Sequence, residues 1–371
     1  MNRKKYELAV QLRHELHQHP ELSNNEVWTK KHLIKFLKEH TKLEIVDRGS
    51  WFYAVYKSAH GKKNTAFRAD FDAVPIDEYI DIPHGSKVQG VSHKCGHDGH
   101  SASLAGFALE IDRYGADNNV YFLFQHAEET GDGAKEAAVF ITENNIDEIY
   151  AYHNMSGIPF KAVAVKNGVS FCASKGMIIH MEGIPSHASM PEKGRNPSFA
   201  IANIINSVPE FTSPDNYKGM VLCTVIQVAI GERAFGTSAS KGELLLTIRA
   251  LYEEEMNMLQ KKIEELAKNE AKKYGLKVNF EYVDVFPETY NHGENVDKIR
   301  KAAKNIGYEL IEMKEAIRSS EDFGYYTKST KGAIFLIGNG EDYPAVHINE
   351  FDFRDELIEV AADLFKEILL H

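Results

Sequence analysis

The stretch Ser92-His93-Lys94-Cys95-Gly96-His97-Asp98-Gly99-His100 decides how the first half of the chain is interpreted, because this polar loop stands between strands and a helix. Small residues at helical spacing predict that helix over 101–114. Strands are expected at 51–56, 65–69, 120–124 and 148–152, and further helices at 6–19, 26–39 and 134–143. Alternating strands and helices indicate an α/β fold whose mostly parallel sheet is flanked by helices and binds ligands at its strand ends.

The pattern changes from about Lys175. Strands are expected at 176–183, 220–230, 242–250 and 277–283, with helices at 197–208 and 253–274. This βαββαβ order is typical of a ferredoxin-like split unit. The α/β rhythm resumes after Pro287, with a helix at 296–307, a strand at 333–337 and a final helix from Arg354. We therefore expect a ferredoxin-like α+β domain at 174–287, inserted into an α/β domain formed by 1–173 and 288–371.

The composition of the 371 residues is that of a soluble globular protein, with 43% hydrophobic and 26% charged residues. No apolar run approaches the ~18–20 residues that a membrane span needs, and the basic start lacks a signal peptide's apolar core. The three cysteines are odd in number and far apart, which favours a reducing compartment. A net charge of −11 argues against a nucleic-acid partner. We expect a cytoplasmic protein without a membrane anchor.

Candidate metal ligands lie at strand ends or in the loops that follow them. They are Cys95 with His97, the adjacent carboxylates Glu128 and Glu129, His153, and His347. Each alone is common in structural roles, as a buried thiol or a solvated carboxylate. Together one Cys, three His and one Glu form a mixed set that suits zinc or a similar divalent ion. Five ligands exceed the needs of one tetrahedral ion, so the set predicts two ions sharing a bridging water, with Glu128 free to act as base.

The same residues carry a resemblance to a known family. The motifs are Arg68–Pro75 (Arg-Ala-Asp-Phe-Asp-Ala-Val-Pro), Cys95–Asp98 (Cys-Gly-His-Asp), Glu128-Glu129, His153, Ser186-His187-Ala188, Glu321-Asp322-Phe323 and Val346-His347. In this order they resemble the aminoacylase and carboxypeptidase family of dinuclear metallopeptidases, and most of all its amidohydrolase branch. The likeness runs from Leu16 to Phe353. It implies a phosphorylase/hydrolase-like catalytic domain with an inserted lid and dimerisation domain.

The resemblance also implies roles for single residues. The metal ligands implied are Cys95, His97, Glu129, His153 and His347, which would hold two divalent ions, zinc in first place and manganese, cobalt or nickel as alternatives. Glu128 matches the general base that takes a proton from the metal-activated water. Asp72 matches an aspartate that supports the metal centre, and Asp70 stands where many relatives have a ligand His. His187 matches a His that stabilises the oxyanion, in many members at the dimer partner's site.

The chain departs from the branch in the segment after Gly231. An Asn-Val-Ile-Pro stretch is common there, and Phe235 stands at the position of its Asn. The difference implies altered substrate recognition, towards a bulkier or less acidic group. Arg233 could anchor a carboxylate instead, since a guanidinium grips carboxylates bidentately, although a solvent-facing Arg is the simpler interpretation.

The leading hypothesis is a metal-dependent amidohydrolase that cleaves the amide bond of N-acyl amino acids or related small amides. A metallo-exopeptidase of carboxypeptidase or dipeptidase type is the alternative within the same chemistry. Two further alternatives are a thiol enzyme, with Cys95 as nucleophile and His97 as its base, and a non-catalytic metal-binding module. A homodimer is expected, because a ferredoxin-like sheet would otherwise present a free edge.

Overall fold

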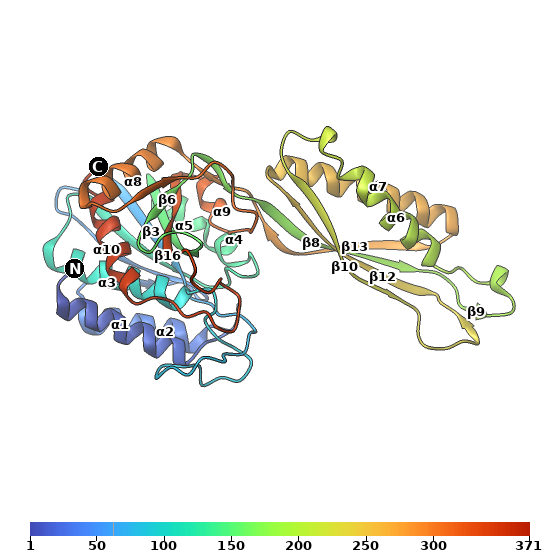
Figure 1. Ribbon diagram of the computed structural model, residues 1–371, viewed down its shortest axis with the longest axis horizontal. Coiled ribbons are helices and arrows are strands. Elements are labelled where there is room, and N and C mark those ends of the chain that lie inside the picture. The colour runs from blue at the N-terminus through green and yellow to red at the C-terminus, as the bar shows by residue number, and fades with distance from the viewer. Residues whose placement is uncertain (62) are drawn as a thin grey trace. The chain divides into compact units, whose positions relative to one another are not determined.

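The computed structural model describes residues 1–61 and 63–371, and these divide into two compact units. Unit 1 consists of Met1–Ser170, Thr289–Ala316 and Glu321–His371, and unit 2 consists of Phe171–Glu288 and Ile317–Ser320 (Figure 1). The chain thus enters unit 2 twice, once for a long continuous segment and once for four residues. No helix in the described residues is long and apolar enough to span a membrane.

Unit 1 is built on an eight-stranded sheet. In sheet order its strands are β1 (Glu44–Asp47), β2 (Phe52–Tyr56), β4 (Asn119–Gln125), β3 (Asn64–Asp70), β5 (Glu148–Ser156), β16 (Lys331–Gly340), β6 (Val163–Val165) and β15 (Leu310–Glu312). The central strands β4, β3, β5 and β16 run parallel. Their residues are almost all buried, as expected for strands covered on both faces. A separate two-stranded sheet pairs β7 (Gly168–Phe171) with β14 (Thr289–Asn291).

Helices cover both faces of that sheet (Figure 1). They are α1 (Arg3–Gln18), α2 (Val27–His40), α3 (His97–Tyr114), α4 (Gly133–Ala137), α5 (Val139–Glu143), α8 (Gly293–Ile306), α9 (Gly324–Thr327) and α10 (Glu356–Ile368). On one face α3 and α10 pack over the sheet through Phe107 and Phe365, which both contact Phe67 of β3. On the other face Phe140 of α5 packs against Tyr53 and Tyr121. The predicted α/β fold is confirmed.

Three predicted boundaries were wrong near the candidate ligands. The structure starts α3 at His97 instead of Ser101, so His97, Asp98 and His100 lie on the helix. Strand β5 continues to Ser156, which places His153 within the strand instead of after it. The helix predicted over 134–143 is two short helices that meet at Ala138. In the first two cases polar residues at the candidate site interrupt the apolar pattern on which the prediction rested.

Unit 2 is an α+β layer structure. Its four-stranded antiparallel sheet has the order β10 (Val221–Ile230), β12 (Lys241–Ala250), β8 (Ala173–Glu182), β13 (Lys277–Phe286). Helices α6 (Ser198–Phe211) and α7 (Glu253–Tyr274) pack on one face (Figure 1). Smaller elements are the pair β9 (Ser186–His187) and β11 (Thr237–Ser238), and the 3-10 turns Pro191–Lys193 and Pro214–Asn216. The order of elements along the chain is the predicted βαββαβ.

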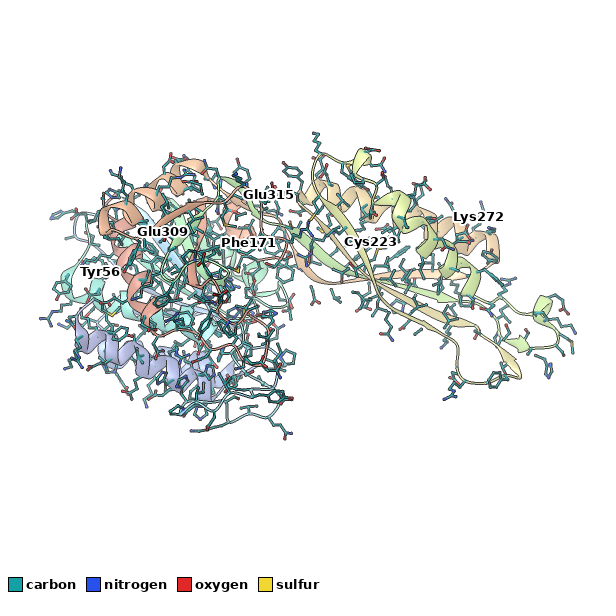
Figure 2. The ribbon with its side chains drawn as sticks, viewed as in Figure 1. Tyr56, Phe171, Cys223, Lys272, Glu309 and Glu315 are labelled. Carbon is teal, nitrogen blue, oxygen red and sulfur yellow. The ribbon has the colours of Figure 1, made fainter. Side chains whose placement is uncertain are left out.

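Helix α7 shows why the sequence folds this way locally. Acidic residues occupy its first turn and lysines its last, which suits the helix dipole. Gly275 ends the helix in the left-handed conformation that glycine adopts without strain. Met256, Leu259 and Ile263 form a buried stripe at helical spacing against the sheet. Figure 2 labels Cys223 on β10 of the sheet, and this cysteine is half-buried and free.

Candidate metal centre

The loop that precedes α3 ends in two candidate ligands. Cys95 is buried, and His97 is the first residue of the helix. Between them Gly96 has a φ of 101°, and a Cβ at this position would lie 2.3 Å from Oδ1 of Asn154. Only glycine fits such a place without strain. The turn at Gly96 brings the ligand atoms of Cys95 and His97 within 4.8 Å of each other.

Asp72, which follows β3, fixes the ring of His97. Its Oδ1 lies 2.9 Å from Nδ1 of His97, and its Oδ2 accepts hydrogen bonds from the backbone N–H of Glu129 and the hydroxyl of Ser23. A carboxylate on one ring nitrogen leaves the other available to a metal ion. Nε2 of His97 is buried, and among the described residues it has no hydrogen-bond partner. This orphaned nitrogen is what a metal ligand requires.

His153 is oriented in the same manner by the backbone. Its Nδ1 donates to the carbonyl of Asn154 at 2.6 Å, which turns Nε2 to within 3.4 Å of Sγ of Cys95. Burial, followed by the nearby rings of His100 and His97, keeps the pKa of His153 well below its usual range. The ring is therefore neutral, as metal binding demands.

His347 approaches from the C-terminal part of unit 1. Its φ of 64° is in the left-handed region, and its backbone N–H donates to the carbonyl of Lys94 at 2.7 Å. Nε2 of His347 lies 3.1 Å from Oε1 of Glu129. A positive φ is uncommon for any residue other than glycine, and residues held in this conformation cluster at active sites and ligand-binding sites. The backbone contact with Lys94 ties His347 to the loop that carries Cys95.

The candidate ligands form overlapping groups. Ligand atoms of Cys95, His97 and His153 lie within 4.8 Å of one another, and so do those of Cys95, Glu129 and His347. A third group joins His97 to Glu128 and Glu129. All five sequence-predicted ligands thus meet in unit 1, in two sets that share Cys95. Two adjacent sites with a common ligand fit a pair of ions better than a single one.

The charge of the cluster also calls for cations. Burial by itself lowers the pKa of His97, but the carboxylates of Asp70 and Asp72 outweigh it and raise the pKa to about 10. Burial raises the pKa of the Cys95 thiol well above its usual range, and Glu129 and Glu128 add to the effect. A thiol enzyme needs the opposite, a lowered thiol pKa. The surroundings of Cys95 therefore argue against the nucleophile hypothesis and fit a thiol that loses its proton to a metal ion.

Glu128 lies beside the ligands and is almost fully buried. It follows Ala127, whose φ of 47° turns the chain directly after β4 and places two carboxylates in succession at the centre. Burial raises the pKa of Glu128 well above its usual range, with Glu321 and Glu129 as the next causes. A carboxyl group with a raised pKa is suited to general acid–base work near neutral pH.

A second layer of buried polar residues was not assigned from the sequence. His100 lies one helical turn after His97 and bridges Asp70 at 2.6 Å and Asn154 at 2.7 Å. Asp98, in the first turn of the helix, makes no cap, because the N-cap position is Gly96. It accepts instead from His17 at 2.8 Å and Arg13 at 3.3 Å on α1. The spacing of His97 and His100 can be seen in the sequence. It places the two residues one helical turn apart only because the helix begins at His97.

The buried ion pair between His17 and Asp98 predicts a pH dependence of stability. Burial lowers the pKa of His17, but Asp98 outweighs it and raises the pKa to about 9. The folded state therefore holds this proton up to pH 9, whereas the unfolded chain releases it near 6.5. Stability from this group is complete below pH 6.5 and is lost as the pH rises through 9.

We expect the wild type to lose up to about 3 kcal/mol more unfolding free energy between pH 6 and pH 10 than His17→Gln does. Chemical denaturation at both pH values measures the difference. Equal losses in the two proteins would contradict the assignment.

The remaining residues singled out in the sequence belong to unit 2. His187 on β9 is exposed, and its Nδ1 lies 2.7 Å from the hydroxyl of Ser189. Phe235 lies in the loop before β11 with its side chain 100% exposed, and Arg233 is exposed in the same loop. The β9–β11 pair connects these positions, because the N–H of Ala188 donates to the carbonyl of Gly236. His187 and Phe235 thus belong to one surface tip of unit 2.

Comparisons with known proteins show the family to which the chain belongs. The model of peptidase family M20/M25/M40 matches residues 66–371. An N-acetylcysteine deacetylase from Bacillus subtilis is 29% identical over 97% of this chain and 95% of its own length. A hippurate hydrolase from Campylobacter jejuni is also 29% identical, with the same coverage of 97% and 95%.

A solved structure extends the likeness to three dimensions. It is a dinuclear metal-binding peptidase of the M20 family from Bacillus subtilis, 27% identical, with a TM-score of 0.83 over 100% of this chain and 98% of its own. The match of the family model covers most of the sequence and includes every predicted ligand. The family resemblance inferred from the sequence motifs is therefore confirmed, and the chain belongs to peptidase family M20/M25/M40.

Proposed function

We propose that this protein hydrolyses the amide bond of N-acyl amino acids or related small amides in the cytoplasm, with Glu128 as general base. The observation that carries the proposal is a buried carboxylate, Glu128, next to the five candidate metal ligands. A purely structural metal site needs no such additional carboxylate. The relatives named above act on N-acyl compounds, and the three cysteines, all unpaired, suit a reducing compartment.

We propose that the centre holds two divalent ions, with zinc the native metal. Cys95, His97, Glu129, His153 and His347 would hold them, and this mixture of thiolate, imidazole and carboxylate suits zinc. When bound, such ions lower the pKa of a water molecule towards ~7 and polarise a carbonyl group. Asp72 keeps the ring of His97 in the orientation that presents Nε2 to the centre.

Side chains of the protein supply the proton transfer and the stabilisation of the oxyanion. Glu128 takes a proton from the attacking water on one oxygen of its carboxylate and passes it to the leaving nitrogen. Its side chain is shielded from bulk solvent, because Glu128 is only 5% exposed. His187 donates a hydrogen bond to the oxyanion of the tetrahedral intermediate, as the family resemblance implies.

A substrate panel tests the proposal. It should contain N-acetyl and N-benzoyl amino acids, with dipeptides as the comparison set, and release of the free amino acid is the measurement. We expect turnover of N-acyl amino acids in preference to dipeptides. Preference for dipeptides would favour the exopeptidase alternative, and no turnover by metal-loaded protein would favour a non-catalytic module.

His187 provides the first mutational prediction. Replacing it with Ala should lower kcat by up to about 10²-fold, because one hydrogen bond to the oxyanion is lost. Steady-state kinetics on the best substrate of the panel measures the change. Ser189→Ala is the control, since it removes the hydroxyl that contacts the His187 ring but leaves the ring in place. An unchanged kcat in His187→Ala would refute the role.

We further propose a homodimer formed through β10. This strand pairs only with β12 among the described strands and exposes an apolar row, Leu222, Val225, Ile226 and Val228. The opposite edge, β13, exposes Lys277, Glu281 and other polar residues. An exposed apolar edge strand is a template for pairing with a second chain.

Light scattering of the wild type should therefore give the mass of a dimer. Ile226→Glu places a charge in the apolar row and should give a monomer. The matched control is Val283→Glu on the edge strand β13, which should stay dimeric. A monomeric wild type would refute the proposal, as would dissociation of the control variant alone.

A further inference from the structure

Unit 2 includes a four-residue segment, Ile317–Ser320, which we call the strap. The chain enters the strap from unit 1 at Ala316 and returns to unit 1 at Glu321. Within unit 2 the backbone N–H of Cys172 donates to the carbonyls of Ile317 and Ser319, both at 3.2 Å. The strap is thus held to the beginning of unit 2 by backbone hydrogen bonds.

Arg249 of β12 holds the other half of the strap. Its Nη1 donates to the carbonyl oxygen of Arg318 and to Oγ of Ser320, the latter at 2.7 Å. One guanidinium nitrogen therefore restrains both the backbone and a side chain of the segment. Arg249 belongs to β12, which lies in the interior of the four-stranded sheet and pairs with a strand on each side.

The two residues after the strap, Glu321 and Asp322, belong to unit 1, and both have carboxylate side chains. Asp322 is firmly held there, with Arg68 at 2.7 Å, Nε2 of Gln125 at 2.7 Å and the N–H of Ala134 at 2.8 Å. Glu321 is held through only one of its two carboxylate oxygens. Its Oε1 lies 3.1 Å from Nη2 of Arg68 and accepts from the backbone N–H of Phe323 at 3.1 Å, while its buried Oε2 has no hydrogen-bond partner among the described residues.

Both carboxylates are close to the proposed base. Carboxylate oxygens of Glu128, Glu321 and Asp322 lie within 4.8 Å of one another, and all three residues are buried. At such distances a displaced carboxylate changes the field at its neighbour strongly, because the surroundings exclude water. Glu321 stands between two anchors, the strap before it and Asp322 after it.

We propose that Arg249 is a positioning residue of the hydrolytic reaction, which by anchoring the strap holds the Glu321 carboxylate in place beside Glu128. The inference rests on the proposed function for its link to turnover. Arg249 touches no reacting atom in this account and acts only through the chain that leads into Glu321. Its loss should therefore affect turnover more than substrate binding.

Kinetics of four variants test the proposal. Arg249→Ala should lower kcat by about 10-fold with KM changed by less than about 2-fold, and Arg249→Lys should recover part of the loss. Glu321→Gln removes the group through which Arg249 acts, so adding Arg249→Ala to it should cost little more. The matched control is Lys175→Met, which removes a buried cation from the adjacent strand β8, where Lys175 contacts Asn257 and Gln260 on α7.

Hydrogen exchange tests the anchoring without any need for turnover. Arg249→Ala should speed exchange in the peptide that spans 317–322, whereas Lys175→Met should not. Unchanged exchange in that peptide would overturn the proposal, even if no substrate were ever found. Losses in Arg249→Ala and Glu321→Gln that multiply in the double variant would also overturn it, as would an equal loss of kcat in Lys175→Met. A wild type that fails the substrate panel would instead refute the proposed function.

Discussion

Glu128→Gln lowers kcat by about 10²- to 10⁴-fold and leaves the metal content of the protein unchanged, if Glu128 is the general base. The amide has the shape of the carboxylate but cannot take a proton from water. The ligand sets that contain Cys95 do not include Glu128, so their geometry should persist. Steady-state kinetics, combined with metal analysis of the same sample, measures both parts of the prediction.

The control for this variant is Glu143→Gln. Glu143 forms a surface ion pair with Arg48 at 3.0 Å, and the loss of such a pair has little effect on a folded protein. Full activity in Glu128→Gln would refute the role of the base. Loss of metal in that variant would instead make Glu128 a ligand, which its place in the group with His97 and Glu129 would then explain.

Removal of the metal ions should abolish hydrolysis and also lower the melting temperature. The centre brings Asp70, Glu128 and Glu129 close to His97, and without cations this surplus of buried negative charge is unfavourable. Ions that bind only the folded state stabilise it by mass action. Activity and thermal unfolding should be measured after dialysis against a chelator, and again after zinc, manganese, cobalt or nickel is added back.

The ion that restores both properties at stoichiometric concentration identifies the native metal. Magnesium serves as the control, because it prefers oxygen ligands and should not replace ions held by Cys95 and imidazoles. Full activity of metal-free protein would refute the metal-dependent reaction. If a thiol reagent also inactivated that metal-free enzyme, the nucleophile hypothesis for Cys95 would have to be reconsidered.

The sequence was sufficient to predict the family and the α/β fold, because both depend on local patterns. The family was predicted from ordered motifs such as Cys95-Gly-His-Asp98. The fold was predicted from the alternation of apolar strands and helices. Their order along the chain survives any error in the exact ends of strands and helices. The comparisons and the structure confirm both predictions.

The sequence could not predict how the ligands are oriented. The apolar pattern on which the strand prediction rested ends at Tyr152. The strand β5 itself continues to Ser156 and therefore includes His153. The network of Arg13, His17 and Asp98 joins residues that are 85 or 81 positions apart, and no local pattern encodes such pairs. The strap was not predicted either, because four residues are too few to show a periodicity.

The place of β16 in the large sheet has a consequence for synthesis of the protein. β16 comes from 331–340 but lies between β5 and β6, which are made much earlier. Domains usually fold in the order in which the ribosome produces them. Here the continuous part of unit 2 can fold while the sheet of unit 1 still lacks a central strand and the centre lacks His347. We expect the nascent chain to bind its metal ions only at the end of translation, after β16 has joined the sheet of unit 1 and His347 has been synthesised.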